Sequence, residues 1–124
     1  MKIKMEKWLG HRFESSCSET EDFKKFASNL RANLKSELSP EYSIVWFSRG
    51  HFYCSACVRH ESSQKLMYIS IPDVRYWQDE WFSKVLYRTM ENEKDYTGGR
   101  NNYCNLRELK KSGLGLLAHI ENVA

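Results

Sequence analysis

Three short runs rich in β-branched and aromatic residues, close together between residues 42 and 72, constrain the fold of this chain most strongly. Only Arg49-Gly50 and a polar ESSQ segment separate these runs, which read YSIVWFSRG, HFYCSACVRH and KLMYISIP. Runs of this composition bounded by turn residues are typical of neighbouring strands. The pattern therefore predicts a three-stranded antiparallel meander that ends at Pro72 and Asp73.

The segment before these strands, residues 18–40, has helical periodicity. One apolar stripe occupies Phe23, Phe26, Leu30, Leu34 and Leu38. Ser18 lies three residues before Glu21, which is the spacing of a capping box, and Pro40 ends the helix. These features predict an amphipathic helix that lies against the sheet.

The segment after the strands predicts a second helix, a loop and a third helix. In residues 77–93 a helical period links Trp81, Phe82, Val85, Leu86 and Met90. Residues 94–105, KDYTGGRNNYCN, have the glycine and asparagine pairs of a loop, and the remainder predicts a C-terminal helix weakened by Gly113 and Gly115. The expected fold is α+β with two layers: helix, three-stranded meander, helix, loop and C-terminal helix.

Length and charge limit the kind of protein. The 124 residues fit a single domain, 1–124, that can bury a core without disulfides or metal. The formal net charge of +3 comes from basic and acidic residues mixed along the chain, so charge alone predicts no nucleic-acid partner. Charged residues interrupt every apolar run of the N-terminus. We therefore expect a cytoplasmic protein, without a membrane partner, whose four cysteines stay reduced.

The segment GHFYCSACVRH contains a Cys-x-x-Cys motif, Cys54 and Cys57, that has two interpretations. A zinc site would need a tight turn at this point, with His60 and Cys104 as further ligands. The alternation of apolar even positions with polar odd positions instead indicates a strand, in which residues three apart point to opposite faces. We favour the strand and expect no cofactor, with a small zinc-binding protein as an alternative.

Catalytic motifs provide no support for an enzyme. The four histidines are scattered, and neither a Gly-x-Ser-x-Gly, a His-Glu-x-x-His nor a Walker-type sequence is present. We therefore predict a protein that is not an enzyme.

Two stretches have the composition of binding surfaces. The outward side of the second strand, with His51, Tyr53 and Arg59, could stack bases or bury a protein partner, or be the polar side of a half-buried sheet. The glycine loop could hold a phosphate or a carboxylate, or be a packed connection. The predicted binding residues are His51, Tyr53, Arg59, Arg75, Tyr96, Gly98, Gly99, Arg100 and Asn101.

Four segments resemble small uncharacterised accessory proteins of bacterial mobile elements, such as conjugative transposons and prophages. The segments are KWLGHRFESSCSETEDFKKF, FSRGHFYCSACV, ISIPDVRYW and EKDYTGGRNNY. Some accessory proteins of this size and setting are anti-CRISPR proteins, which bind an RNA-guided Cas nuclease and block DNA loading or cleavage. The resemblance implies a host bacterial cell and a protein partner, and it identifies no site residue.

These observations lead to one functional hypothesis and two alternatives. We expect a non-enzymatic protein-binding module of mobile-element origin, most concretely an anti-CRISPR inhibitor that uses the strand face and the glycine loop. The first alternative is a nucleic-acid-binding accessory factor whose Arg49, Arg59, Arg75 and Arg100 contact phosphates, so that affinity would fall with salt. The second alternative is the small zinc-binding protein.

Overall fold

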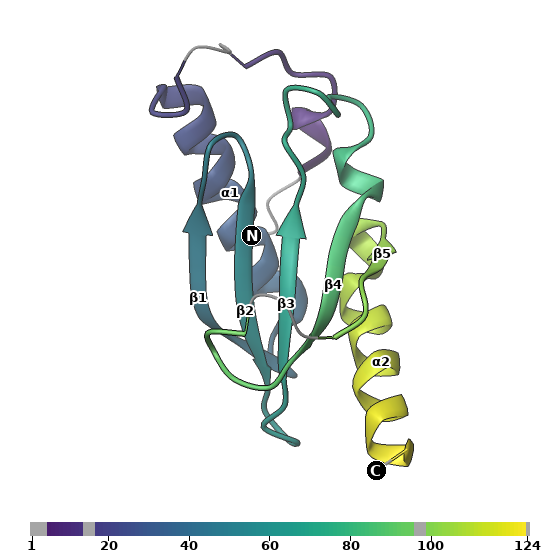
Figure 1. Cartoon of the computed structure of the whole chain (residues 1–124). Coiled ribbons are helices and arrows are strands. Elements are labelled where there is room, and N and C mark those ends of the chain that lie inside the picture. Colours follow the sequence, from purple (N-terminus) through teal and green to yellow (C-terminus); the bar gives the residue numbers. More distant parts are fainter. Residues whose placement is uncertain (1–4, 14–16, 96–98, 124) are drawn as a thin grey trace.

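The computed structural model describes residues 5–13, 17–95 and 99–123. Its strands form one antiparallel meander in the order β1 to β5, and the elements follow the chain as Figure 1 shows. The helices are η1 (Met5–Trp8), α1 (Glu21–Leu38), η2 (Trp81–Ser83), η3 (Leu106–Glu108) and α2 (Leu109–Val123). The strands are β1 (Tyr42–Arg49), β2 (Cys54–His60), β3 (Leu66–Ile71), β4 (Val85–Met90) and β5 (Asn102–Cys104).

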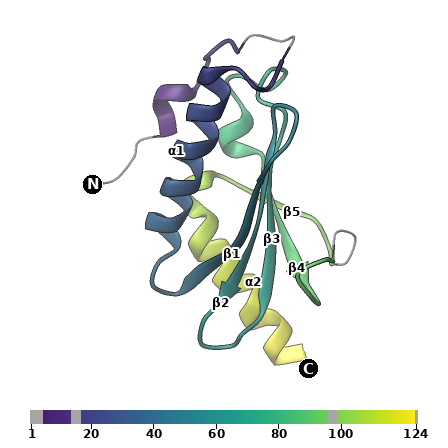
Figure 2. The same cartoon turned by 90° about the vertical axis from the view of Figure 1, so that its left-hand side faces the viewer.

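The molecule has two layers, because α1 and α2 lie on the same face of the sheet (Figure 2). The core between the layers is aromatic: Phe13, Phe23, Phe26 and Trp81 are all buried. The Phe26 ring meets the Trp81 ring edge-on at a centroid distance of 5.2 Å. The α+β two-layer prediction is confirmed, and the sheet has one helix-covered face and one helix-free face.

Helix α1 confirms the stripe that predicted it, since Phe23, Phe26, Leu30, Leu34 and Leu38 are all buried. The predicted capping box is wrong. The N-cap residue is Thr20, whose hydroxyl donates to Asp22 Oδ1 at 2.7 Å, while the backbone N–H of Phe23 donates to the same oxygen at 2.8 Å. The Asp22 carboxylate therefore satisfies the free amide of Phe23 at the start of the helix.

The helix predicted for residues 77–93 is wrong. The segment contains one short turn, η2, and then strand β4, which pairs with β3. Val85, Tyr87 and Thr89 alternate with Leu86, Arg88 and Met90. A short apolar run fits a helical and a strand period equally well, and pairing with the free edge of β3 decides for the strand. The meander accordingly has five strands where the sequence predicted three.

Residues 94–105 were predicted to be a loop, yet they include β5, which pairs with β4 from Val85↔Cys104 to Tyr87↔Asn102.

The C-terminal helix is confirmed as α2, and Gly113 lies where this helix contacts the sheet. A Cβ atom at Gly113 would lie 2.7 Å from the Met67 methyl carbon and 2.8 Å from the Tyr42 hydroxyl oxygen. The glycine thus lets α2 approach the sheet closely. None of the helices in the described ranges is both long and apolar enough to cross a bilayer.

Candidate functional site

Strand β2 divides its side chains between the two faces of the sheet. Cys54, Ala56 and Val58 join the core under the helices, while Cys57 belongs to a second apolar cluster on the helix-free face. The strand interpretation of the Cys-x-x-Cys segment is therefore confirmed. The regular strand is shorter than predicted, because Phe52 has a φ of 62° in the turn between β1 and β2.

Residues 91–95, which follow β4, lie across the helix-free face in front of the strands (Figure 1). Three side chains of the sheet bind this segment. The Trp46 indole N–H donates to the Glu93 carbonyl at 3.0 Å, Arg59 pairs with the Glu93 carboxylate at 3.3 Å, and Arg88 donates to the Asp95 carbonyl at 3.3 Å. Residues 91–95 therefore act as a cover for part of this face.

Beside this cover lies a groove of about 520 Å³, which we call the aromatic groove. Its lining consists of Trp46, Phe47, Ser48, Tyr53, Ser55, Tyr68, Glu93 and Lys94. The Trp46 and Tyr68 rings are 6.2 Å apart, and Tyr53 is 45% exposed. The groove thus presents aromatic surfaces between two hydroxyls and a pair of opposite charges.

Local geometry explains how Tyr53 comes to line the groove. Gly50 and Tyr53 face each other in the β1–β2 turn, where the Gly50 N–H donates to the Tyr53 carbonyl at 2.8 Å. A Cβ atom at Gly50 would lie 2.2 Å from the Tyr53 ring. The ring therefore packs directly over the glycine, and any larger residue at position 50 would displace it.

A β-bulge places Trp46 in the groove. The register of β1 against β2 shifts between Ile44 and Trp46, so that Ile44 pairs with Val58 and Trp46 pairs with Cys57. In a regular strand, Ile44 and Trp46 are two residues apart and would point to the same face; the bulge at Val45 breaks this alternation. The bulge turns Trp46 to the helix-free face, while Ile44 packs on the core.

Two buried groups, Arg88 and Cys57, lie next to the residues that line the groove. Arg88 is only 4% exposed, and its guanidinium carbon lies 4.4 Å from the centre of the Tyr68 ring. Burial, reinforced by the Glu93 carboxylate and opposed by Arg59, raises the pKa of Cys57 to about 11. Cys57 is consequently a neutral thiol at physiological pH.

The four residues weighed as zinc ligands do not converge. Cys54 and Cys57 lie on opposite faces, and Cys104 is in β5, three strands from Cys54, or about 14 Å at ordinary strand spacing. The His60 ring contacts the Ser63 hydroxyl at 2.7 Å. Among the described residues, no three His, Cys, Asp or Glu side chains form a group that could hold a metal ion.

The three cysteines of the sheet, Cys54, Cys57 and Cys104, are also poorly suited to nucleophilic chemistry. All four cysteines of the chain are free, and burial raises the pKa of Cys54 to about 12 and that of Cys104 to about 11. A reactive cysteine needs a lowered pKa and access to solvent. These three thiols have the opposite properties.

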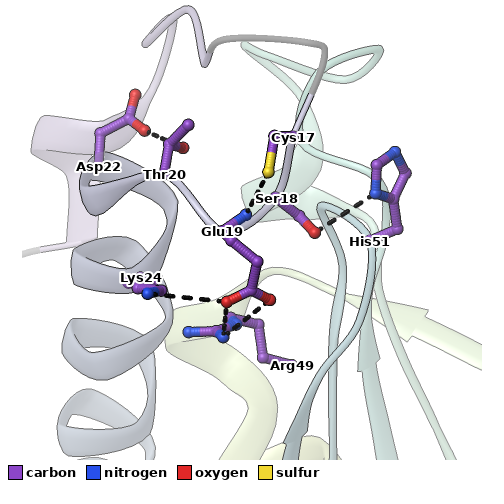
Figure 3. A network of polar contacts seen from close by, with 8 residues as sticks. All are labelled: Cys17, Ser18, Glu19, Thr20, Asp22, Lys24, Arg49 and His51. Carbon is purple, nitrogen blue, oxygen red and sulfur yellow. Dashed lines mark hydrogen bonds and ion pairs between the residues drawn. The ribbon is translucent and has the colours of Figure 1, made fainter.

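His51, predicted to share a surface with Tyr53, lies instead at the tip of the β1–β2 hairpin (Figure 3). Its Nδ1 atom is 3.3 Å from the Ser18 hydroxyl. Beside it, Arg49 pairs with Glu19 at 2.9 Å, and Lys24 approaches the same carboxylate at 3.7 Å. These contacts connect the segment before α1 to the hairpin. None of their residues lines the aromatic groove.

The other predicted binding residues are scattered. Arg75 pairs with Asp73 at 2.6 Å and lies 4.4 Å from the centre of the Phe52 ring, while Arg59 pairs with Glu93. Gly99 has a φ of +78°, and a Cβ atom there would lie 2.7 Å from the Thr89 carbonyl oxygen. Arg100 and Asn101 are exposed, and Tyr96 and Gly98 lie outside the described residues. Among the predicted binding residues that fall within the described ranges, only Tyr53 lines the aromatic groove.

Sequence reasoning missed most of the groove. Trp46, Tyr68, Glu93 and Lys94 line it and were not predicted. Tyr68 could have been found, because it follows the same alternation that singled out Tyr53 and pairs with Cys57 across the sheet. Glu93 and Lys94 could not, since they fell within or beside a segment that was predicted to be helical.

Comparison of the chain with protein-family models, with curated proteins and with solved structures finds no match. The resemblance to accessory proteins of mobile elements therefore stays a prediction.

Proposed function

We propose that the protein is a non-enzymatic protein-binding module that contacts its partner through the helix-free face. The observation that carries this proposal is the aromatic groove of about 520 Å³ on a sheet face that none of the helices in the described ranges covers. The centres of protein interfaces are enriched in aromatic residues, and their rims are polar. Trp46, Tyr53 and Tyr68 supply the aromatic part, and Glu93 and Lys94 supply a rim with both signs of charge.

The groove is organised before a partner arrives. The Trp46 indole N–H donates a hydrogen bond to the Glu93 carbonyl, and the Tyr68 ring lies against the Arg88 guanidinium. Side chains that are already held in place lose little conformational freedom on binding. This arrangement favours recognition of a partner side chain by preformed aromatic surfaces, as in the hot spots of protein interfaces.

A nucleic-acid partner is the alternative, and the ion pairs favour it less. Arg49, Arg59 and Arg75 are paired with Glu19, Glu93 and Asp73, so phosphates would have to compete with these carboxylates. The Glu93 carboxylate also lines the groove and would repel a phosphate. A salt-sensitive mobility shift with single-stranded or duplex nucleic acid would support this alternative.

The most concrete form of the proposal is an inhibitor of an RNA-guided Cas nuclease. It follows from the resemblance to mobile-element proteins, and the geometry supports its protein-binding part. The partner surface would be one that the nuclease uses for DNA loading or for domain movement.

A cleavage assay with a purified nuclease, its guide RNA and target DNA tests this form. We expect the native protein to slow cleavage and the Tyr53→Ser variant to lose most of that effect. Tyr76→Ser is the matched control, because Tyr76 is 77% exposed and is not part of the groove lining. Unchanged cleavage at a large molar excess of the native protein would contradict the inhibitor proposal.

A further inference from the structure

Strand β1 forms one edge of the sheet, and its backbone offers hydrogen-bonding groups there. The Gly50 N–H donates to the Tyr53 carbonyl, which makes Gly50 and Tyr53 a hydrogen-bonded pair. Such pairs alternate with non-bonded pairs in an antiparallel ladder, so Arg49 and Phe47 direct their N–H and C=O groups away from β2.

Residues in the first half of β1 also direct backbone N–H and C=O groups away from β2. The Glu61 N–H donates to the Glu41 carbonyl at 2.9 Å, and the ladder continues through Tyr42↔His60. Counted from this bonded pair, Tyr42 and Ile44 direct their backbone groups away from β2. The edge thus has two short bonding segments, one on each side of the bulge at Val45.

A second groove, the α1–β1 groove, runs along this edge between the helix and the strand. It measures about 410 Å³ and is lined by Arg31, Lys35, Leu38, Ser39, Tyr42, Ser43 and Ile44. Figure 2 shows α1 alongside the edge of the sheet that β1 forms. Side chains of an added strand that point toward α1 would enter this groove.

The charge of the α1–β1 groove is positive. Arg31 and Lys35 are both exposed and lie one helical turn apart, and neither forms an ion pair with another residue of the described ranges. Farther along the same side of the molecule, Lys24 and Arg49 share the Glu19 carboxylate. Like charges four residues apart on a helix repel each other. A carboxylate placed between Arg31 and Lys35 would offset this repulsion and would form favourable charged hydrogen bonds with both side chains.

We propose that the edge of β1 and the α1–β1 groove bind a short acidic segment of a partner protein as an added strand. The backbone of that segment bonds to the outward groups of Tyr42 and Ile44, which belong to the half of β1 that lines the α1–β1 groove. Its alternate side chains point toward α1, and acidic residues at these positions meet Arg31 and Lys35. The remaining side chains lie on the helix-free side of the edge and are apolar, because Val45 and Trp46 are there.

Two features select this occupant. The bulge at Val45 interrupts the ladder, which limits an added strand to a few residues on either side and blocks a long edge-to-edge pairing. A second copy of the chain would bring its own Arg31 and Lys35 to the edge and meet like charge. An acidic peptide has both the backbone amides that the edge requires and the charge that the groove complements.

This inference goes beyond the proposed function, because its charge recognition depends on Arg31 and Lys35, which do not line the aromatic groove. Tyr53→Ser tests the aromatic groove, and variants of Arg31 and Lys35 test the α1–β1 groove. The failure of one proposal therefore leaves the other in place.

Fluorescence anisotropy with a labelled octapeptide that alternates glutamate and valine tests the inference. We expect the native protein to bind this peptide, and the double variant Arg31→Glu, Lys35→Glu to bind it at least about tenfold more weakly. Lys25→Glu is the matched control, because Lys25 is also an exposed cation of α1 but does not line the groove, and its affinity should stay within about twofold of the native value.

A second measurement distinguishes strand addition from simple charge attraction. Binding should slow hydrogen exchange of the outward amide of Ile44, and a peptide that alternates lysine and valine should not bind. Equal binding of the lysine peptide, unchanged exchange at β1, or tighter binding of a thymidine oligonucleotide than of the acidic peptide would each overturn the inference.

Discussion

The two faces of the sheet differ in what closes them, although the same strands build both. On the helix-covered face, residues of β2 and β3 pack against the aromatic rings of α1, and Phe23 and Phe26 are completely buried. On the helix-free face, one connection of a few residues covers a small cluster around Cys57 and leaves the aromatic groove open. The first face stabilises the fold, and the second leaves aromatic surface exposed, which our proposal assigns to a partner.

The largest expected effect comes from the helix-covered face. Phe26 contacts the rings of Trp8, Phe13 and Trp81, and Phe26→Ala would leave a cavity among them. We expect the free energy of unfolding to fall by about 3–5 kcal/mol. Urea denaturation followed by Trp fluorescence measures this change. A loss below about 1 kcal/mol would mean that this face does not hold the fold together.

Two glycines on α2 provide a matched comparison of the side that faces the sheet with the side that faces solvent. Gly113→Ala places a methyl group within 3 Å of Met67 and Tyr42, and we expect it to cost about 1–3 kcal/mol of unfolding free energy. At Gly115 a Cβ atom meets nothing within 4 Å, so Gly115→Ala should stabilise the helix by about 0.5–1 kcal/mol. Thermal denaturation of both variants measures the contrast, and equal effects would contradict the packing of α2.

The cover of the helix-free face should open separately from the core. Trp46→Phe removes the indole donor to the Glu93 carbonyl, at a cost of about 1 kcal/mol. The exposed Cys17 is first replaced by serine in both proteins so that it does not react. We expect thiol alkylation of Cys57 to become several times faster in the Trp46→Phe variant, while Cys54 stays protected under the helices. Mass spectrometry of the labelled peptides measures both rates. If the two rates rise together, the cover is not an independent element.

Alkaline pH should weaken the fold through the buried thiols. Burial raises the pKa of Cys54 from 9.0 to about 12 and that of Cys57 from 9.0 to about 11. The folded protein therefore holds these protons above pH 9, where the unfolded chain releases them, and the free energy of unfolding falls as pH rises from 9 toward 12. Urea denaturation at several pH values should show a shallower decline for Cys54→Ala than for the native protein. An equally steep decline would contradict this cause.

Much of the fold could be predicted from local pattern, and the failures have physical causes. The long stripe of α1 fits only a helical period, whereas the short apolar run from Trp81 to Met90 fits two periods. Its conformation depends on the unpaired edge of β3, which lies elsewhere in the sequence. Local periodicity therefore cannot predict that long-range pairing.

The aromatic groove was harder to predict because distant segments build it. The alternation in β2 correctly placed Tyr53 and Ser55 on the polar side. Trp46 reaches that side only because of the bulge at Val45, and nothing in the alternation marks the extra residue. Glu93 reaches the groove by a contact between residues 46 and 93, which only the folded chain brings together.

We propose that the helix-free face binds a protein partner, and site-specific photo-crosslinking is the most direct experiment on this proposal. A photoreactive phenylalanine derivative would replace Tyr53 in one variant and Tyr76, an exposed tyrosine outside the groove lining, in another, and both would be expressed in a bacterial host. We predict that position 53 crosslinks a discrete protein and that position 76 does not, with both variants as stable as the native protein. Absence of a protein adduct at position 53, or an adduct with nucleic acid in its place, would contradict the claim.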